Sequence, residues 1–249
     1  KKANEIYELA LQHCSGCIEL WLVYCLHMQD CVDEDITPVR NAFERAVNSV
    51  GRLYHSHILW EKYIEFEQAQ NEMIRVSNLY RRALQISMDV PLLDAMWKRF
   101  QDHVNEVSST ELTSDLEERN SLSDLGTDEE KRSIFLSWTQ PLYQSTKDES
   151  EKIKYFEERI KRSYFHPKAL DNDDLDNWRR YLEYREQTND KEAVRQLYKF
   201  ALVVCAHSSD ISKRYGSFLV NQLNDIASAR QVFENQTKFF CPGSRPHAW

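Results

Sequence analysis

Glycine and proline are scarce in this sequence, since 249 residues contain only 5 Gly and 6 Pro. Because these residues supply most of the conformations that tight turns require, their scarcity disfavours a fold of many short strands joined by hairpins. The glycines are also too isolated to form a phosphate-binding loop. They are Gly16, Gly51, Gly126, Gly216 and Gly243.

Long apolar runs and a positive net charge are also absent. No apolar run approaches the roughly 20 residues that are needed to span a bilayer. The first residues, from Lys1 to Glu5, do not open a secretory signal segment. The net charge is −8, so bulk electrostatics do not attract the chain to nucleic acid or to an anionic membrane.

Cysteine patterns and catalytic motifs are weak. The six cysteines are scattered through a chain large enough to fold without disulfides, so we expect reduced thiols of an intracellular protein. Cys14 and Cys17 have the spacing of metal ligands, but a structural zinc site usually needs a second such pair, which the sequence lacks. No Gly-x-Ser-x-Gly motif or acid–base pair stands out. We therefore expect no metal, no cofactor and no enzymatic activity.

Aromatic residues, in contrast, are abundant and regularly spaced. The chain has 12 Tyr, 11 Phe and 6 Trp. Successive tryptophans are 37 to 41 residues apart until a last gap of 71, as if one were missing near residues 212–214. Such a period is typical of stacked helical repeats. The tryptophans are Trp21, Trp60, Trp97, Trp138, Trp178 and Trp249.

An aromatic residue follows most tryptophans by three positions, which places both rings on one face of a helix. We name this helix the A helix of each repeat. Where tryptophan is missing, Tyr215 follows Ser212 at the same spacing. The other pairs are Trp21 with Tyr24, Trp60 with Tyr63, Trp97 with Phe100, and Trp178 with Tyr181.

A second pattern lies about 20 residues after each A helix, and we name its helix the B helix. There an aromatic residue is followed at +3 by alanine, as in Phe43/Ala46, Tyr80/Ala83 and Tyr198/Ala201, whereas Phe233 keeps only the aromatic. A large side chain beside a small one lets a neighbouring helix approach closely. We therefore predict an all-α fold, an α-solenoid of antiparallel helix pairs with these residues in its core.

The repeat is interrupted after Phe100. Residues 105–130 are rich in acidic residues, Ser and Thr and contain no aromatic residue, which predicts an acidic flexible linker or insertion. This divides the chain into an N-terminal repeat block (1–104), that segment, and a second block (131–249) opening with a long or kinked helix around Pro141. The second block is expected to be truncated at Trp249, where a further A helix would begin.

The pairing of Trp-x-x-Tyr/Phe helices with aromatic-x-x-Ala helices resembles HAT (half-a-tetratricopeptide) repeats. A more specific likeness is to a signature of the pre-mRNA-processing factor 39 family, from which Ser163, Pro167 and Ala169 depart. It comprises Ile160-Lys161-Arg162-Ser163-Tyr164-Phe165-His166-Pro167-Lys168-Ala169-Leu170, followed by Asn177-Trp178-Arg179-Arg180-Tyr181-Leu182.

This resemblance implies a nuclear, non-catalytic scaffold for protein–protein interactions in pre-mRNA splicing. Such a scaffold binds protein subunits of the U1 small nuclear ribonucleoprotein and helps to select 5′ splice sites. The resemblance also implies a dimer, with a second copy or a paralogue, through repeats beyond Trp249. RNA contact would be indirect or weak, and no contact with a membrane is expected.

One basic region is a candidate contact for RNA phosphates or for an acidic partner. Glutamates alternate with its cations, however, which favours a solvated helix with internal ion pairs. The basic residues are Lys154, Arg159, Lys161, Arg162 and Lys168.

Two other functions fit a helical repeat. One is a generic tetratricopeptide-like adaptor that grips peptides in a groove. The other is a helical-repeat enzyme subunit of the prenyltransferase type, although repeats of that family place Asn-Tyr before Trp, whereas here Tyr or Phe follows Trp.

Overall fold

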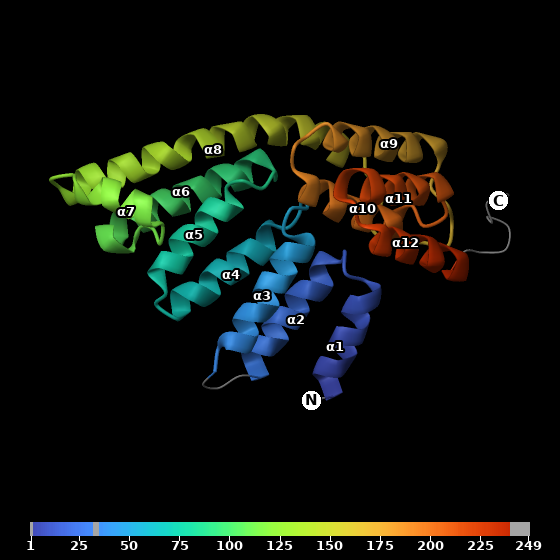
Figure 1. The fold of residues 1–249 in the computed structure, drawn as a ribbon, viewed down its shortest axis with the longest axis horizontal. Coiled ribbons are helices and arrows are strands. Elements are labelled where there is room, and N and C mark those ends of the chain that lie inside the picture. The colour runs from blue at the N-terminus through green and yellow to red at the C-terminus, as the bar shows by residue number, and fades with distance from the viewer. Residues whose placement is uncertain (1, 32–34, 240–249) are drawn as a thin grey trace. The chain divides into compact units, whose positions relative to one another are not determined.

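The computed structural model describes residues 2–31 and 35–239, which fold into α-helices and one short 3-10 helix, with no strand among them (Figure 1). None of these helices is long and apolar enough to cross a membrane. In chain order the helices are α1 (Lys2–His13), α2 (Ile18–Cys31), α3 (Thr37–Val50), α4 (His57–Ala69), α5 (Met73–Ala83), α6 (Val90–Glu106), η1 (Ser109–Glu111), α7 (Leu116–Ser123), α8 (Asp128–Glu157), α9 (Asn172–Glu186), α10 (Lys191–Val204), α11 (Ser209–Leu223) and α12 (Ile226–Phe239).

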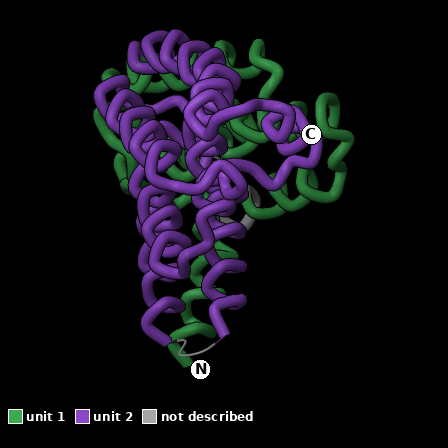
Figure 2. The backbone as a smooth tube through the Cα atoms, turned by 90° about the vertical axis from the view of Figure 1, so that its left-hand side faces the viewer, with its two compact units in different colours: residues 1–17, 156–249 green, residues 18–155 purple. Residues whose placement is uncertain are grey.

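The chain forms two compact units, residues 18–155 and residues 1–17 with 156–249 (Figure 2). In the first, α2 packs on α3 and α4 on α5, and each pair continues onto the next A helix, α4 or α6. In the second, α9 packs on α10 and α11 on α12, with α10 against α11. The fold is therefore the predicted all-α solenoid of antiparallel helix pairs.

The structure buries nearly all of the aromatic residues and alanines that the repeat pattern assigns to the core. Trp97 is only half-buried. Phe233 is 39% exposed, so it is less enclosed than the other residues of the set. Its ring lies across Gly216 of α11, where an added Cβ would meet ring atoms at 2.3 Å. The buried set is Trp21, Tyr24, Phe43, Ala46, Trp60, Tyr63, Tyr80, Ala83, Phe100, Trp178, Tyr181, Tyr198, Ala201 and Tyr215.

Aromatic contacts join the B helices α3, α5 and α10 to the A helix that follows each of them, and for α5 the contact is that of Tyr80 with Phe100, at 5.8 Å and a tilt of 47°. Phe43 stacks on Tyr63 with ring centroids 4.9 Å apart and ring planes 3° apart. Tyr198 stacks on Tyr215 at 4.9 Å and 20°. The A-helix partner is the residue three positions after tryptophan, or after Ser212 in α11. The contact therefore confirms residue 212 as the position of the missing tryptophan.

A second contact covers the tryptophan inside each hairpin. The residue two positions after the B-helix aromatic lies over the indole ring of the same repeat. Arg82 lies 5.2 Å from the centre of the Trp60 ring, and the rings of Phe200 and Trp178 are 5.7 Å apart. An arginine in this place adds a cation–π attraction to the packing.

The long helix α8 runs for 30 residues with Pro141 inside it, in agreement with the expected long helix. Its last turn provides a B-helix contact that the sequence pattern missed. Phe156 stacks on Tyr181 of α9 at 5.2 Å and 5°, like the B-helix aromatics of the regular hairpins. The pattern missed it because residue +3 is Arg159 rather than alanine.

The segment 105–130 differs from a flexible linker. It contains η1 and α7, and Leu112, Thr113 and Leu122 are buried. The guanidinium of Arg81 on α5 donates to both carboxylate oxygens of Glu118, each at 2.8 Å. The acidic residues that suggested solvation thus anchor a folded insertion, while the proposed block boundaries at 104 and 131 stay a prediction.

Candidate interaction surface

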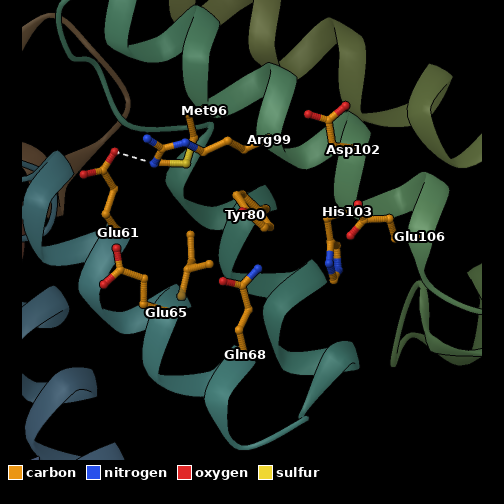
Figure 3. A pocket seen from close by; sticks show the side chains of 10 residues that line it. Glu61, Glu65, Gln68, Tyr80, Met96, Arg99, Asp102, His103 and Glu106 are labelled. Carbon is orange, nitrogen blue, oxygen red and sulfur yellow. Dashed lines mark hydrogen bonds and ion pairs between the residues drawn. The ribbon is translucent and has the colours of Figure 1, made fainter.

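A groove opens between the successive A helices α4 and α6, and we name it the α4–α6 groove (Figure 3). It encloses about 320 Å³, and the side chains of Ile64, Tyr80 and Met96 contribute apolar lining. Its lining also includes polar and charged residues, which are Glu61, Glu65, Gln68, Arg99, Asp102, His103 and Glu106.

Negative charge dominates this groove. Glu61 and Glu65 lie one turn apart on α4, and Asp102 and Glu106 lie one turn apart on α6. The single guanidinium, that of Arg99, donates to Glu61 Oε1 at 2.7 Å. Like charges four residues apart destabilise a helix by about 0.2–0.5 kcal/mol per pair. The two helices thus share an arrangement that a bound cation would relieve.

His103 does not offset this charge. Its ring is buried, and Nε2 lies 2.9 Å from Ser77 Oγ. Burial lowers the pKa of His103 to about 4, so the imidazole is uncharged at neutral pH. Burial also raises the pKa of the nearby Tyr80 hydroxyl, and the charges of Glu61 and Asp102 add to that rise.

A related groove of about 350 Å³ lies where the end of α9, the α9–α10 connection and the start of α10 face α11, and we name it the α9–α11 groove. Aligning Trp60 with Trp178 and Trp97 with Ser212 matches five lining positions. The matched pairs are Gln68 with Glu186, Arg99 with Arg214, Asp102 with Ser217, His103 with Phe218, and Glu106 with Asn221.

The chemistry of the α9–α11 groove is different. Arg214 donates to both carboxylate oxygens of Glu186, from Nε at 3.1 Å and Nη2 at 2.6 Å, and Tyr198 also donates its hydroxyl hydrogen to Glu186. The rest of the lining is mostly neutral amides and hydroxyls. Lys191 also lines it, so the repeat yields an acidic groove in one unit and, in the other, a groove with two cations and one carboxylate.

The structure uses several of the predicted basic residues for internal contacts. Lys154 pairs with Asp89 at 3.3 Å, within the unit of residues 18–155. Lys161 lies 3.1 Å from Asp171 and 3.0 Å from Asp174, within the other unit. Arg162 donates from Nη2 to the carbonyl oxygen of Lys168 at 3.0 Å, and Arg159 is exposed at the end of the same loop. This distribution fits ion-paired surfaces better than a continuous phosphate-binding patch.

The connection between α8 and α9 also presents two exposed aromatic residues. Tyr164 is 62% exposed and Phe165 is 53% exposed. His207 of the α10–α11 connection fixes the segment, because its Nε2 lies 3.1 Å from the carbonyl oxygen of His166. Exposed aromatics on an ordered connection are well suited to contact a protein partner. The sequence placed these rings beside the basic residues but did not predict their exposure.

The buried cysteines of the described chain are ordinary protonated thiols. Burial raises the pKa of Cys25 and of Cys205 to about 12, so both remain protonated at neutral pH. Among the described residues, no group of three or more His, Cys, Asp or Glu side chains is arranged to hold a metal ion.

Antiparallel helix pairs, stacked through a B-helix aromatic on the next A helix, define a helical-repeat protein of the HAT type. A family model described as PRP39 N-terminal HAT repeat matches residues 1–102, and one described as PRP39 C-terminal HAT repeat matches residues 151–248. The chain belongs to the PRP39 family of HAT-repeat proteins.

Individual relatives agree with this assignment. The chain is 26% identical to Pre-mRNA-processing factor 39 of Schizosaccharomyces pombe, over 98% of this chain and 43% of that protein. It is 27% identical to Pre-mRNA-processing factor 39 of Homo sapiens, over 97% of this chain and 41% of the relative. With Pre-mRNA-processing factor 39-2 of Arabidopsis thaliana the identity is 30%, over 92% and 25%. The chain therefore spans less than half the length of these relatives.

Proposed function

We propose that this chain is a non-catalytic scaffold for protein–protein interactions in pre-mRNA splicing, in the nucleus. We further propose that it contributes to assembly of the U1 small nuclear ribonucleoprotein and to selection of 5′ splice sites. The observation that carries the proposal is the match of both repeat blocks to the two PRP39 HAT models. The relatives in Schizosaccharomyces pombe and Homo sapiens are named as pre-mRNA-processing factors.

The use of polar side chains in the structure supports a scaffold. Arg82 donates to both carboxylate oxygens of Glu44, at 2.7 and 3.0 Å, and Tyr63 donates to the same carboxylate at 2.9 Å. These three residues tie α3, α4 and α5 together. Such networks hold successive hairpins in register and so give a partner a fixed surface.

The proposed partners are protein subunits of the U1 particle, and RNA contact is indirect. The net charge of −8 and the internal ion pairs of Lys154 and Lys161 both disfavour direct binding of RNA phosphates. A dimer through repeats beyond Trp249 is part of the same proposal, and Trp249 itself lies outside the described residues.

An affinity experiment in nuclear extract tests the proposal. The immobilised chain is expected to retain protein subunits of the U1 particle, identified by mass spectrometry, and to retain them after ribonuclease treatment. Retention that ribonuclease abolishes would contradict the protein-scaffold mechanism. The absence of U1 proteins above the level of uncoated beads would contradict the function.

The exposed aromatics between α8 and α9 offer a sharper version of this test. Replacing Tyr164 and Phe165 by alanine should reduce retention of U1 proteins about tenfold, because exposed aromatic anchors carry much of the energy of protein interfaces. The matched control replaces Ile6 and Leu9 of the same compact unit, which are 69% and 57% exposed, by alanine. Equal losses in both variants would remove this segment, and with it the nearby Arg159, as the proposed contact.

A peptide-binding adaptor outside splicing is the second candidate function, and the two grooves favour it. Its distinguishing result is binding of short peptides together with no retention of U1 proteins. A peptide array read beside the affinity experiment separates these two functions.

A further inference from the structure

The α4–α6 groove has the charge and lining of a binding site for a basic polypeptide. We infer that it binds an extended protein segment rich in arginine and lysine. This inference does not depend on the proposed function, since it concerns one groove and the chemistry of its ligand.

Charge complementarity is the main argument. The lining carries four carboxylates against one guanidinium. Arg99 pairs with Glu61, and Lys62, outside the groove, lies 2.6 Å from Glu65. Asp102 and Glu106 are exposed, and within the described parts of the chain neither forms a hydrogen bond or an ion pair. These two carboxylates are therefore available to a cationic side chain.

The form of the groove adds a second argument. Apolar atoms of Ile64, Tyr80 and Met96 lie between the acidic residues of the two A helices, as Figure 3 shows for Tyr80 and Met96. Lysine and arginine side chains have an aliphatic stem below the charged group. A stem can contact the apolar lining while the charged group reaches a carboxylate on either side.

The α9–α11 groove provides a control within the same molecule. Ser217 and Asn221 stand where the acidic groove has Asp102 and Glu106, and Arg214 neutralises Glu186. A helical repeat does not require acidic residues at these two positions for its packing, because the related groove forms without them. The carboxylates at these two positions are therefore a feature of the α4–α6 groove and not a requirement of the repeat fold.

Fluorescence anisotropy with a synthetic peptide tests the inference. The probe is a fluorescein-labelled dodecapeptide of six arginines alternating with serine and glycine, titrated with the whole 249-residue chain. The variant carries Asp102→Asn and Glu106→Gln, and the control variant carries Glu129→Gln and Glu151→Gln on the surface of α8. Both variants lose two exposed carboxylates from the same compact unit, so their net charges are equal.

The groove variant should bind the peptide about fivefold or more weakly than the unmodified chain, whereas the control should change by less than about twofold. Arg99→Gln should tighten binding about two- to fivefold, because it removes the cation that competes for Glu61. Equal weakening in the two double variants would show attraction by net charge alone and overturn the inference. An absence of measurable binding to the unmodified chain at low salt would also overturn it. Failure to retain U1 proteins, in contrast, would leave this result unchanged.

Discussion

The regular hairpins and the α6–α8 region cover the aromatic residues of their A helices in different ways. In two regular hairpins a B-helix aromatic lies flat on the next A helix, as Phe43 does on Tyr63, whereas Tyr80 meets Phe100 at a tilt of 47°. In the α6–α8 region, Tyr143 of the long helix α8 stacks on Trp97 of α6, at 4.9 Å and 13°, and so takes the place that Arg82 or Phe200 has beside the tryptophans of the regular hairpins. Asp94 then accepts hydrogen bonds from the Tyr143 hydroxyl at 2.7 Å and from Lys147 at 2.9 Å.

This difference indicates what the repeat must preserve. The hairpin can be replaced by one continuous helix, provided that another ring covers each A-helix aromatic. The irregular region is less enclosed, since Trp97 is half-buried while Trp60 and Trp178 are buried. We therefore expect substitutions in the regular hairpins to cost more stability than equivalent ones between α6 and α8.

The largest expected effect is that of removing a regular B-helix aromatic. Phe43→Ala should lower the free energy of unfolding of its unit by about 3–5 kcal/mol, because the ring is fully buried. Trp97→Ala should cost about 2 kcal/mol, since part of that ring remains in water. Urea unfolding followed by circular dichroism measures both. A larger loss for Trp97→Ala than for Phe43→Ala would contradict the expectation that substitutions in the regular hairpins cost more stability.

The buried ion pair between α3 and α4 comes next. Glu67 is fully buried and accepts hydrogen bonds from Arg40 Nε at 2.7 Å and Nη2 at 2.8 Å. Glu67→Ala should destabilise the unit by about 2–3 kcal/mol, because it leaves the guanidinium largely desolvated without its carboxylate. The double variant Arg40→Ala/Glu67→Ala should recover part of that loss in the same urea titration. No recovery would contradict a role for the charge.

His103 extends the comparison to the pH dependence of the free energy of unfolding. It lies six residues after Trp97, where regular A helices have Phe66 or Tyr184. Because its folded pKa of about 4 is below the ordinary value of 6.5, the unfolded chain binds the proton more tightly. Stability is therefore full above about pH 6.5 and is lost as pH falls toward 4, by roughly 3 kcal/mol. His103→Gln should flatten this part of the pH–stability curve, and parallel curves for the two proteins would exclude the effect.

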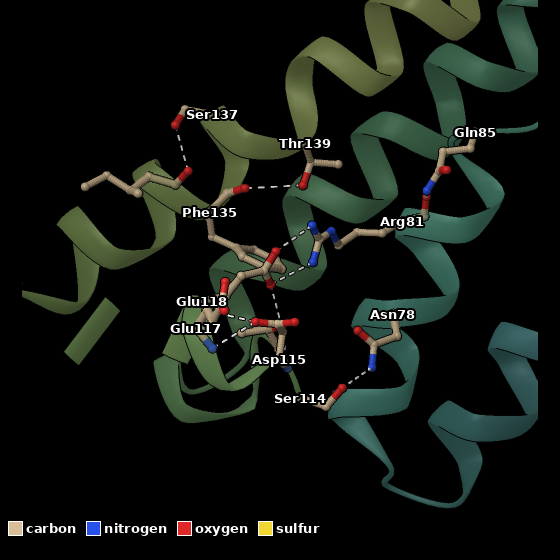
Figure 4. Close-up of polar contacts among 12 residues, drawn as sticks. Asn78, Arg81, Gln85, Ser114, Asp115, Glu117, Glu118, Phe135, Ser137 and Thr139 are labelled. Carbon is tan, nitrogen blue, oxygen red and sulfur yellow. Dashed lines mark hydrogen bonds and ion pairs between the residues drawn. The ribbon is translucent and has the colours of Figure 1, made fainter. Parts of the chain in front are cut away.

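The smallest expected effect is that of the ion pair that anchors the insertion (Figure 4). Arg81 and Glu118 are about one-fifth exposed and bonded through two hydrogen bonds. Glu118→Gln should cost only about 0.5–1 kcal/mol, because water already solvates part of both groups. Hydrogen exchange of the α7 amides should increase more than that of the α5 amides. Equal increases would indicate that the insertion and the hairpin unfold together.

The sequence was most informative where aromatic spacing alone sets the packing. In a helical protein, large aromatic side chains at a regular spacing are expected in the core. The structure buries nearly all of the A-helix tryptophans, the +3 aromatics and the B-helix alanines. The position of the missing tryptophan followed from the same spacing, and Tyr215 and Phe218 both contact Tyr198 as that position requires.

Other features could not be read from that pattern. Phe156 lacks the following alanine, so only the stacked ring of Tyr181 reveals its role. Acidic composition over residues 105–130 suggested solvation, whereas the Arg81 partner of Glu118 lies 37 residues earlier in the chain. The acidic residues of the α4–α6 groove can be recognised in the sequence, because Glu61/Glu65 and Asp102/Glu106 are like-charged pairs at a spacing of four residues. Their approach across the groove depends on how α4 and α6 pack.

Alanine substitution of Phe156 and of its neighbour Tyr155 tests the central claim most directly. If the end of α8 acts as a B helix, Phe156→Ala should lower the free energy of unfolding by about 2 kcal/mol, because it removes the ring stacked on Tyr181. Tyr155, which is 50% exposed, should tolerate alanine with a loss of about 0.5 kcal/mol or less. Equal losses, or a larger loss for Tyr155→Ala, would contradict the interpretation that the last turn of α8 acts as a B helix for α9.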